Sequence, residues 1–224
     1  MDLDMTLDQL KTNRHPKVVA NRMLQISLLR RLVIAYGLFA MAASAQQLTL
    51  EIKDYATLPI TGSPETATDN VASLLARINF LREEPGGKRF FVNDLNGPLY
   101  IVDRETKKVT TYLDFNGRES HGGLFHKFRF ENGQGNGLLN FVFDPNYVHN
   151  GKFYTIHLED PSLPGSNMPD NTNFPGFNIA GYTTTPAIHT PGSILYEGVL
   201  IEWTDTNTSN LTFEGTARHG PHGR

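Results

Sequence analysis

Short apolar runs separated by polar turn residues fill this chain from residue 77 onward, and they predict β-strands rather than helices. The first four runs are Arg77–Leu81, Arg89–Val92, Leu99–Val102 and Val109–Leu113. The segments between them are Glu83–Gly87, Asn96-Gly97-Pro98 and Asp103–Lys107. Because Gly, Pro, Asn and Asp are typical of tight turns, the pattern predicts four strands joined as hairpins.

A second group of four runs repeats this layout further along the chain. Its predicted strands are Leu138–Phe143, Lys152–Leu158, Gly198–Trp203 and, at the outer edge, Asn210–Phe213. Gly198–Trp203 repeats the pattern of Gly97–Val102. A four-stranded unit that recurs along a chain is typical of β-propeller blades. The predicted fold class is therefore all-β, a β-propeller of four-stranded blades with about two blades present, which leaves an incomplete ring.

Two segments outside these strands are predicted to be mainly loops. Residues 159–195 contain six prolines among Gly, Asn and Thr, so we expect a long surface loop inserted there. Residues 46–73 form a leader, in which Leu48–Ile52 alternates apolar and polar positions and predicts a short strand. The rest of the leader is rich in Thr, Pro and Gly and predicts a loop. Residues 74–224 make up the propeller part.

An export signal precedes the leader. The basic pair Arg30-Arg31 is followed by an uncharged apolar run at 32–42 and then by Ala43-Ser44-Ala45. This order predicts a secretory signal peptide at residues 23–45, cleaved after Ala45. The apolar run is shorter than the roughly 20 residues that span a bilayer, so no membrane anchor is expected after cleavage. The predicted location is periplasmic or extracellular. Residues 1–22 are predicted to be a disordered extension or a segment upstream of the true start at Met23.

Composition narrows the classes of partner. The chain has 224 residues and a formal net charge of −3, so no overall positive field attracts nucleic acid. It contains no cysteine, which excludes disulfides and thiolate metal sites. Its central histidines are scattered without zinc-site spacing, and His149 is predicted to be a turn residue. These histidines are His121, His126, His149 and His157. No metal ligands are assigned from the sequence.

The stretch from Gly137 to Tyr154 carries a family resemblance. Its Gly137-Leu138-Leu139, Phe143-Asp144-Pro145-Asn146-Tyr147, Asn150-Gly151 and Phe153-Tyr154 resemble the second-blade signature of the soluble quinoprotein glucose/sorbosone dehydrogenases. Arg89-Phe90-Phe91-Val92 with Gly97–Val102 resembles the first blade. The resemblance covers about residues 74–217. It implies an exported six-bladed β-propeller that oxidises a sugar or polyol by hydride transfer to pyrroloquinoline quinone, with calcium as a second cofactor. The alternative is a non-catalytic surface or carbohydrate-binding β-propeller whose Pro-rich loop supplies the contacts.

Two functional positions of that family are altered in this chain. Its quinone-binding members have a Gln just ahead of the Gly-Leu-Leu, whereas here Gln134 lies further upstream in Gly133-Gln134-Gly135-Asn136-Gly137. A one-residue bulge would aim Gln134 at the cofactor, and a plain Gly-rich turn would not, so Gln134 is the one candidate cofactor ligand. The family's catalytic His follows the second blade. Neither His219 nor His222 has its spacing, so the catalytic residue stays unknown. The Arg218–Arg224 ending predicts a truncated propeller without assured activity.

Overall fold

The computed structural model describes Gln25, Leu28, Arg31 and residues 48–62, 76–119, 121–130, 135–184 and 196–219. The chain divides into two compact units, Met1–Lys53 and Asp54–Arg224. In the first unit Gln25, Leu28 and Arg31 are helical and exposed. All other residues of the predicted signal peptide and of the 1–22 extension lie outside the described part of the chain.

The short strand predicted at Leu48–Ile52 does not form, so that prediction is wrong. The side chains of Leu48, Leu50 and Ile52 are 90, 79 and 87% exposed. A strand needs a neighbour that takes its backbone hydrogen bonds, and an alternating pattern does not supply one. The leader is therefore without a strand from residue 48 to residue 62.

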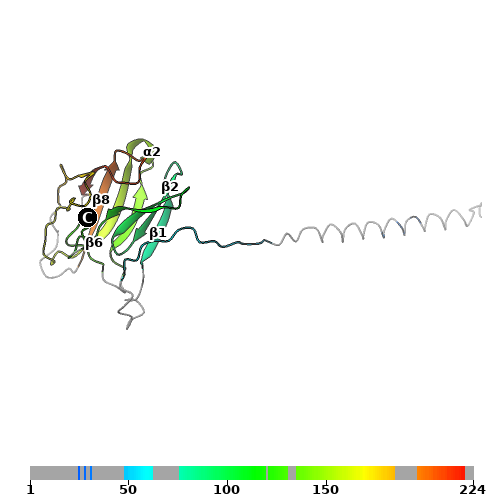
Figure 1. The fold of residues 1–224 in the computed structure, drawn as a ribbon, viewed down its shortest axis with the longest axis horizontal. Helices are drawn as coiled ribbons and strands as arrows, with labels where there is room; N and C mark the ends of the chain where they lie inside the picture. The colour runs from blue at the N-terminus through cyan, green and yellow to red at the C-terminus, as the bar shows by residue number, and fades with distance from the viewer. Residues whose placement is uncertain are drawn as a thin grey trace, which may run out of the picture. The chain divides into compact units, whose positions relative to one another are not determined.

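Residues 78–114 form the first sheet, an antiparallel meander in the order β1-β2-β3-β4 (Figure 1). Its strands are β1 (Ile78–Glu83), β2 (Arg89–Asp94), β3 (Pro98–Asp103) and β4 (Val109–Asp114). Each predicted strand is confirmed, with ends that differ by no more than two residues. Gly86 and Gly87 both have positive φ in the turn between β1 and β2, which explains the glycine pair there.

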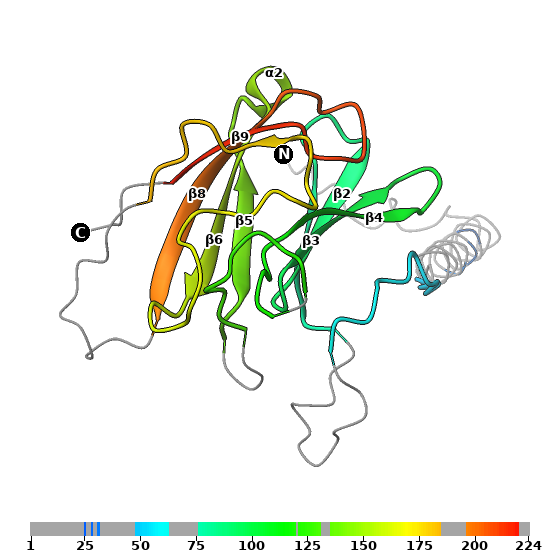
Figure 2. The same ribbon diagram turned by 60° about the vertical axis from the view of Figure 1, so that its left-hand side comes forward.

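The second sheet has the strand order β5-β6-β8-β9-β7 (Figure 2). Its strands are β5 (Leu138–Phe143), β6 (Lys152–Glu159), β7 (Phe177–Asn178), β8 (Glu197–Asp205) and β9 (Gly215–His219). The one-turn helix α2 (Tyr147–Asn150) joins β5 to β6. Only β7 pairs in parallel, with β9. The described residues between 76 and 219 are thus built of two β-sheets with one short helix, and the predicted all-β class is confirmed.

The outer edge predicted at Asn210–Phe213 is wrong, because β9 begins at Gly215. Glu214 holds the preceding loop in place, since its carboxylate accepts hydrogen bonds from the side-chain amides of Asn207 (3.3 Å) and Asn210 (2.6 Å). Phe213 turns inward, and its ring centroid lies 5.4 Å from that of Trp203. Side-chain hydrogen bonds of Asn compete with strand pairing in this way, and the apolar pattern does not reveal it.

The Pro-rich insert at 159–195 is a surface loop only in part. Among its described residues, 159–184, Phe177 is 1% exposed and Tyr182 is 6% exposed, and both belong to the main core. β7 lies in this insert and pairs with β9 at the edge of the second sheet. The prediction of a purely surface loop is therefore wrong, because the insert supplies both a strand and two buried rings.

Aromatic rings fill the space between the two sheets. Phe91 of β2 contacts Phe141 and Phe143 of β5, with ring centroids 6.2 and 5.0 Å apart. Phe153 of β6 stacks on Trp203 of β8 at 6.0 Å. Such pairs add to the free energy of burial through edge and offset contacts, so the ring-rich composition explains how the sheets adhere.

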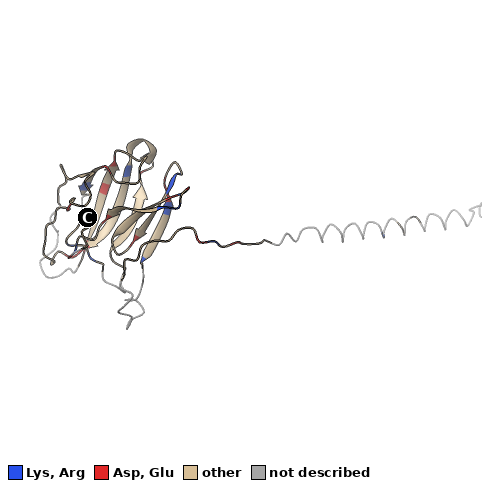
Figure 3. Cartoon of the chain, viewed as in Figure 1, with Lys and Arg blue, Asp and Glu red and all other residues tan. Residues whose placement is uncertain are grey.

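Charged residues of both signs are scattered over the two sheets (Figure 3). Within the parts of the chain that the structure describes, no helix has the length and apolarity to cross a membrane.

Candidate functional site

Polar residues gather where β2 and β4 end and where β3 and β5 begin. The group, named here the polar end cluster, comprises Arg77, Asp94, Asn96, Asp114, Asn116 and Asn136. Five of the six side chains are 7% exposed or less, and Asp114 is half-buried. Buried polar side chains are costly unless they are hydrogen-bonded, so such a group needs a structural or functional reason.

A close backbone contact brings the two sheets together at this cluster. The N–H of Leu138 donates to the carbonyl of Leu95 in the turn between β2 and β3 (3.2 Å). A Cβ atom placed on Gly137 would lie 1.6 Å from that same carbonyl oxygen, and Gly137 has φ +104°. Only glycine fits there, so the Gly of the Gly137-Leu138-Leu139 motif is explained by the packing of one sheet on the other.

Asp94 and Arg77 organise the centre of the cluster. Asp94 Oδ1 accepts from the backbone N–H of Arg77 (3.1 Å) and of Asn96 (2.9 Å), and Asp94 Oδ2 accepts from the Thr61 hydroxyl (2.6 Å). The Arg77 guanidinium donates to Asn96 Oδ1 (3.2 Å) and to the carbonyls of Phe130 (2.8 Å) and Asn136 (3.4 Å). Both oxygens of Asp94 are thus committed to the protein itself.

Asn136 is the exception within the cluster. It is 2% exposed, yet neither its Nδ2 nor its Oδ1 has a hydrogen-bond partner in the described chain. Leaving a buried amide without partners costs about 1–3 kcal/mol for each unsatisfied group. Asn136 belongs to the cluster through its backbone carbonyl, which accepts from Arg77, and its unsatisfied amide is the feature that a polar ligand would relieve.

Asp114 adds a carboxyl group with altered acidity. Burial raises the pKa of Asp114 to about 6, the hydrogen bond from the Asn116 N–H opposes this, and the nearby charge of Asp94 adds to the rise. The backbone N–H of Asn116 lies 2.9 Å from Asp114 Oδ1. A carboxyl with a pKa near 6 exchanges its proton close to neutral pH, which is the range useful for general acid–base chemistry.

The cluster does not fit the quinone that the family resemblance implies. Pyrroloquinoline quinone carries three carboxyl groups and needs cationic partners, but the cluster has one guanidinium beside two aspartates. Arg77 already donates to a side-chain amide and to two carbonyls. For calcium, no three His, Asp or Glu side chains gather as a metal site among the residues described. A neutral polyhydroxylated ligand suits amides and carboxylates better, and quinone and calcium stay predictions.

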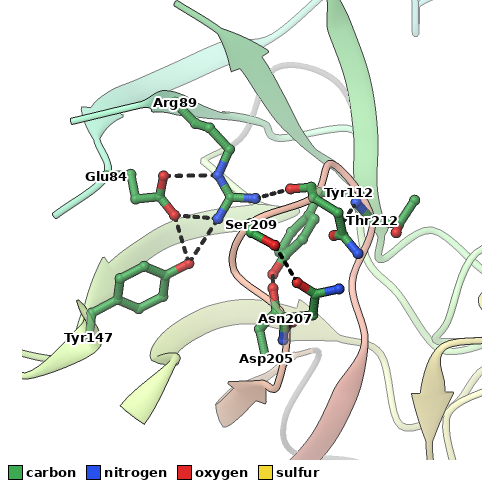
Figure 4. Close-up of polar contacts among 9 residues, drawn as sticks. Glu84, Arg89, Tyr112, Tyr147, Asp205, Asn207, Ser209 and Thr212 are labelled. Carbon is green, nitrogen blue, oxygen red and sulfur yellow. Dashed lines mark hydrogen bonds and ion pairs between the residues drawn. The ribbon is translucent and has the colours of Figure 1, made fainter. Parts of the chain in front are cut away.

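A second polar network lies at the opposite end of β2 and links the two sheets (Figure 4). Arg89 donates to both carboxylate oxygens of Glu84, to the Tyr147 hydroxyl (3.3 Å) and to the carbonyl of Asn210. The Tyr112 hydroxyl donates to Asp205. Burial raises the pKa of Tyr112 and of Tyr147, and the charges of Asp205 and Glu84 respectively reinforce the shift. Every group here is satisfied by the protein, so this network is structural.

The histidines that the structure describes do not converge on either site. His149 lies in α2, so its predicted turn position is confirmed as a single helical turn that Gly151 ends with φ +61°. His126 lies near Asp170, and His157 is fully buried against Phe125 with Nε2 3.0 Å from Glu159. His219 ends β9 and lies against Tyr182.

The candidate ligand Gln134 and also His222 lie outside the described residues. Asn136 was missed by the sequence interpretation, although it stands directly ahead of Gly137-Leu138-Leu139. That is the position at which the family resemblance implies an amide that reaches the cofactor. The signal that could have identified Asn136 was its position in the sequence and not its residue type, because Asn136 is an Asn where the family has a Gln.

Comparison of the sequence with models of known protein families gives no match, and none of the curated proteins matches it. The assignment of function therefore depends on the residues and their geometry.

Proposed function

We propose that this chain is an exported, non-catalytic β-propeller protein that binds a sugar or polyol at the polar end cluster. The observation that carries the proposal is the buried Asn136 amide, whose two polar atoms have no partner in the described structure. An amide that can donate and accept pairs well with neighbouring hydroxyl groups, and a neutral ligand is compatible with Asp94 and Asp114. The export signal rests on the residue order of 23–45.

The proposal is tested by isothermal titration calorimetry of the purified chain with D-glucose, sorbitol and cellohexaose. We expect saturable binding of at least one of these, and at least a tenfold loss of affinity in Asn136→Leu. The control is Asn146→Ala at the other end of β5, because Asn146 is exposed and its side chain caps nothing. No binding of any probe, or equal affinity in both variants, would overturn the proposal.

A second candidate function is the oxidation of a sugar or polyol that the family resemblance implies. It is favoured by Asp114, because a carboxyl with a pKa of about 6 is half deprotonated at pH 6 and mostly deprotonated at neutral pH, where it accepts a proton from a hydroxyl group. The test is dye reduction by the chain with D-glucose, calcium and pyrroloquinoline quinone. This candidate is supported if dye reduction depends on the quinone and is lower in Asp114→Asn. It is eliminated if dye reduction by the chain does not exceed that of the control with quinone alone.

A further inference from the structure

The first sheet has two buried faces, and each has a different cover. Its inner face, with Phe91, Leu99 and Ile101, belongs to the core shared with the second sheet. Its outer face carries Val92, Tyr100 and Val102, which are 1–3% exposed and form a separate small core. Ala56 and Leu58 pack on that outer face. A segment upstream of the sheet, residues 54–62, thus acts as a cover, named here the arm.

Contacts at both ends fasten the arm. At one end the Tyr55 ring lies edge-on to Phe90 at 5.7 Å, with the Lys107 ammonium 3.9 Å from its centroid. At the other end the Thr61 hydroxyl donates to Asp94 (2.6 Å) and accepts from Asn96 (3.0 Å). Between these ends Ile60 is 63% exposed and contributes nothing to the small core. The arm is held by a few side chains and by no strand pairing.

The second sheet has one covered face and one exposed face. Phe153, Thr155 and Ile201 are buried on one side, where the ring centroid of Phe153 lies 5.9 Å from that of Tyr112 in the first sheet. On the other side Val142, Ile156 and Leu200, from three neighbouring strands, are 51, 36 and 43% exposed, and Ile156 pairs directly with Leu200. Lys152 and Glu202 form an ion pair of 2.9 Å on this exposed face, so they neutralise each other.

Strand register shows that corresponding faces of the two sheets have different covers. The sequence match of Gly97–Val102 with Gly198–Trp203 aligns Tyr100 with Ile201. Tyr100 pairs with Val92 in the first sheet, and Ile201 pairs with Thr155 in the second sheet, so these two pairs lie at corresponding places. The Val92–Tyr100 face is covered by the arm, whereas the Thr155–Ile201 face belongs to the main core, where Tyr112 of the first sheet contacts Phe153. The arm therefore covers the face of the first sheet that corresponds to the core face of the second sheet.

The same correspondence identifies what the exposed face resembles. Phe91 pairs with Ile101, and the corresponding pair is Tyr154 with Glu202. The exposed face of the second sheet thus corresponds to the face by which the first sheet packs on the second. Each chain therefore has two faces suited to a sheet-to-sheet contact. One is the exposed face of the second sheet, and the other is the outer face of the first sheet, which the arm covers.

We propose that the exposed face of the second sheet binds the outer face of the first sheet in a second copy of this chain, and that the arm controls this assembly by covering the outer face. The contact joins two different surfaces, so it is head-to-tail and produces either a closed ring of copies or a filament. Release of the arm is the event that permits assembly.

The test measures the mass of the purified chain by light scattering after size-exclusion chromatography. The natural chain is expected to be a monomer, and Leu58→Asp, which places a charge in the arm's apolar contact, is expected to at least double the mass. Adding Leu200→Lys to Leu58→Asp is expected to restore the monomer. Ile60→Asp is the control in the arm and is expected to remain a monomer.

Circular dichroism shows whether each variant keeps its β-sheet signal, and the double variant serves as a folded reference if Leu58→Asp precipitates. The proposal is overturned if Leu58→Asp stays a folded monomer or if Leu200→Lys leaves the assembly intact. It is also overturned if the natural chain already assembles through Leu200 with its arm in place.

Discussion

The phenol of Tyr147 donates a hydrogen bond of 3.1 Å to the carboxylate of Glu84, joining the turn after β5 to the end of β1. Arg89 donates to both partners, so the contact is part of a buried ion pair between the sheets. The turn that carries Tyr147 is built by Asp144, whose Oδ1 accepts from the Asn146 N–H and the Asn150 amide. The most recognisable motif of the chain therefore serves sheet packing rather than chemistry.

We predict that Tyr147→Phe lowers the free energy of unfolding by about 2 kcal/mol, because it removes a buried hydrogen bond to a charged carboxylate. Urea unfolding monitored by Trp203 fluorescence measures this. The control is Tyr154→Phe, which removes a half-buried hydroxyl 3.1 Å from Asp144 and is expected to cost less than about 1 kcal/mol. Equal losses in the two variants would contradict a special role for the Glu84 contact.

Two glycines that lie two positions apart in the same segment are predicted to respond differently to alanine. Gly137→Ala places a Cβ on the Leu95 carbonyl at a positive φ, so we expect a loss of at least about 3 kcal/mol. Gly135→Ala meets nothing within 4 Å and should be nearly neutral. Thermal unfolding of both variants provides the comparison, and a tolerant Gly137 would show that the turn between β2 and β3 does not approach β5 this closely.

The raised pKa of Asp114 predicts a stability that falls as pH rises. Between the ordinary value of 3.8 and about 6 the folded chain holds a proton that the unfolded chain has released. The stabilisation is complete below pH 3.8 and is lost as pH passes through 6. Asp114→Asn should therefore stabilise the chain at neutral pH, by at most about 3 kcal/mol.

The matched control for Asp114 is Asp103, which is the last residue of β3 and is partly exposed. Hydrogen bonds from Thr106 lower the pKa of Asp103, so its stabilising effect is present at neutral pH and is lost in acid. Asp103→Asn should slightly destabilise the chain at pH 7, the opposite sign to Asp114→Asn. Unfolding curves between pH 4 and pH 8 distinguish the two, and a shared sign would refute the burial of Asp114.

Asn136 and Asn93 form a further pair for comparison. Asn136→Leu removes an unsatisfied buried amide, so without ligand we expect a gain of about 1–3 kcal/mol in unfolding free energy. Asn93 is fully buried, donates to the Leu138 carbonyl (2.6 Å) and accepts from the Phe80 N–H (3.0 Å). Asn93→Leu should destabilise by a similar amount, because both backbone groups lose their partner. Destabilisation by Asn136→Leu would show that its amide has a structural partner.

Short apolar runs bounded by turn residues were sufficient to predict the four strands of the first sheet and β5, β6 and β8. Those strands contain β-branched and aromatic residues between Gly, Pro and Asn turns, and such local signals act over a few residues. The same reasoning failed at Leu48–Ile52, where the pattern exists without a partner strand, and at Asn210–Phe213, where Glu214 captures the loop. It also missed Phe177 and Tyr182, because burial of a loop residue depends on what lies opposite it.

By itself, then, the sequence determined most of the strands, the hairpin turns and the all-β class, because each depends on residues close together along the chain. Only the tertiary structure decided that Gly137 contacts Leu95 and that Asp94 and Arg77 share a buried cluster with the unsatisfied Asn136. It also decided that the arm covers one face of the first sheet, whereas one face of the second sheet stays exposed. These relationships join residues from separate parts of the chain, such as Thr61 with Asp94, and no local pattern encodes such distant contacts.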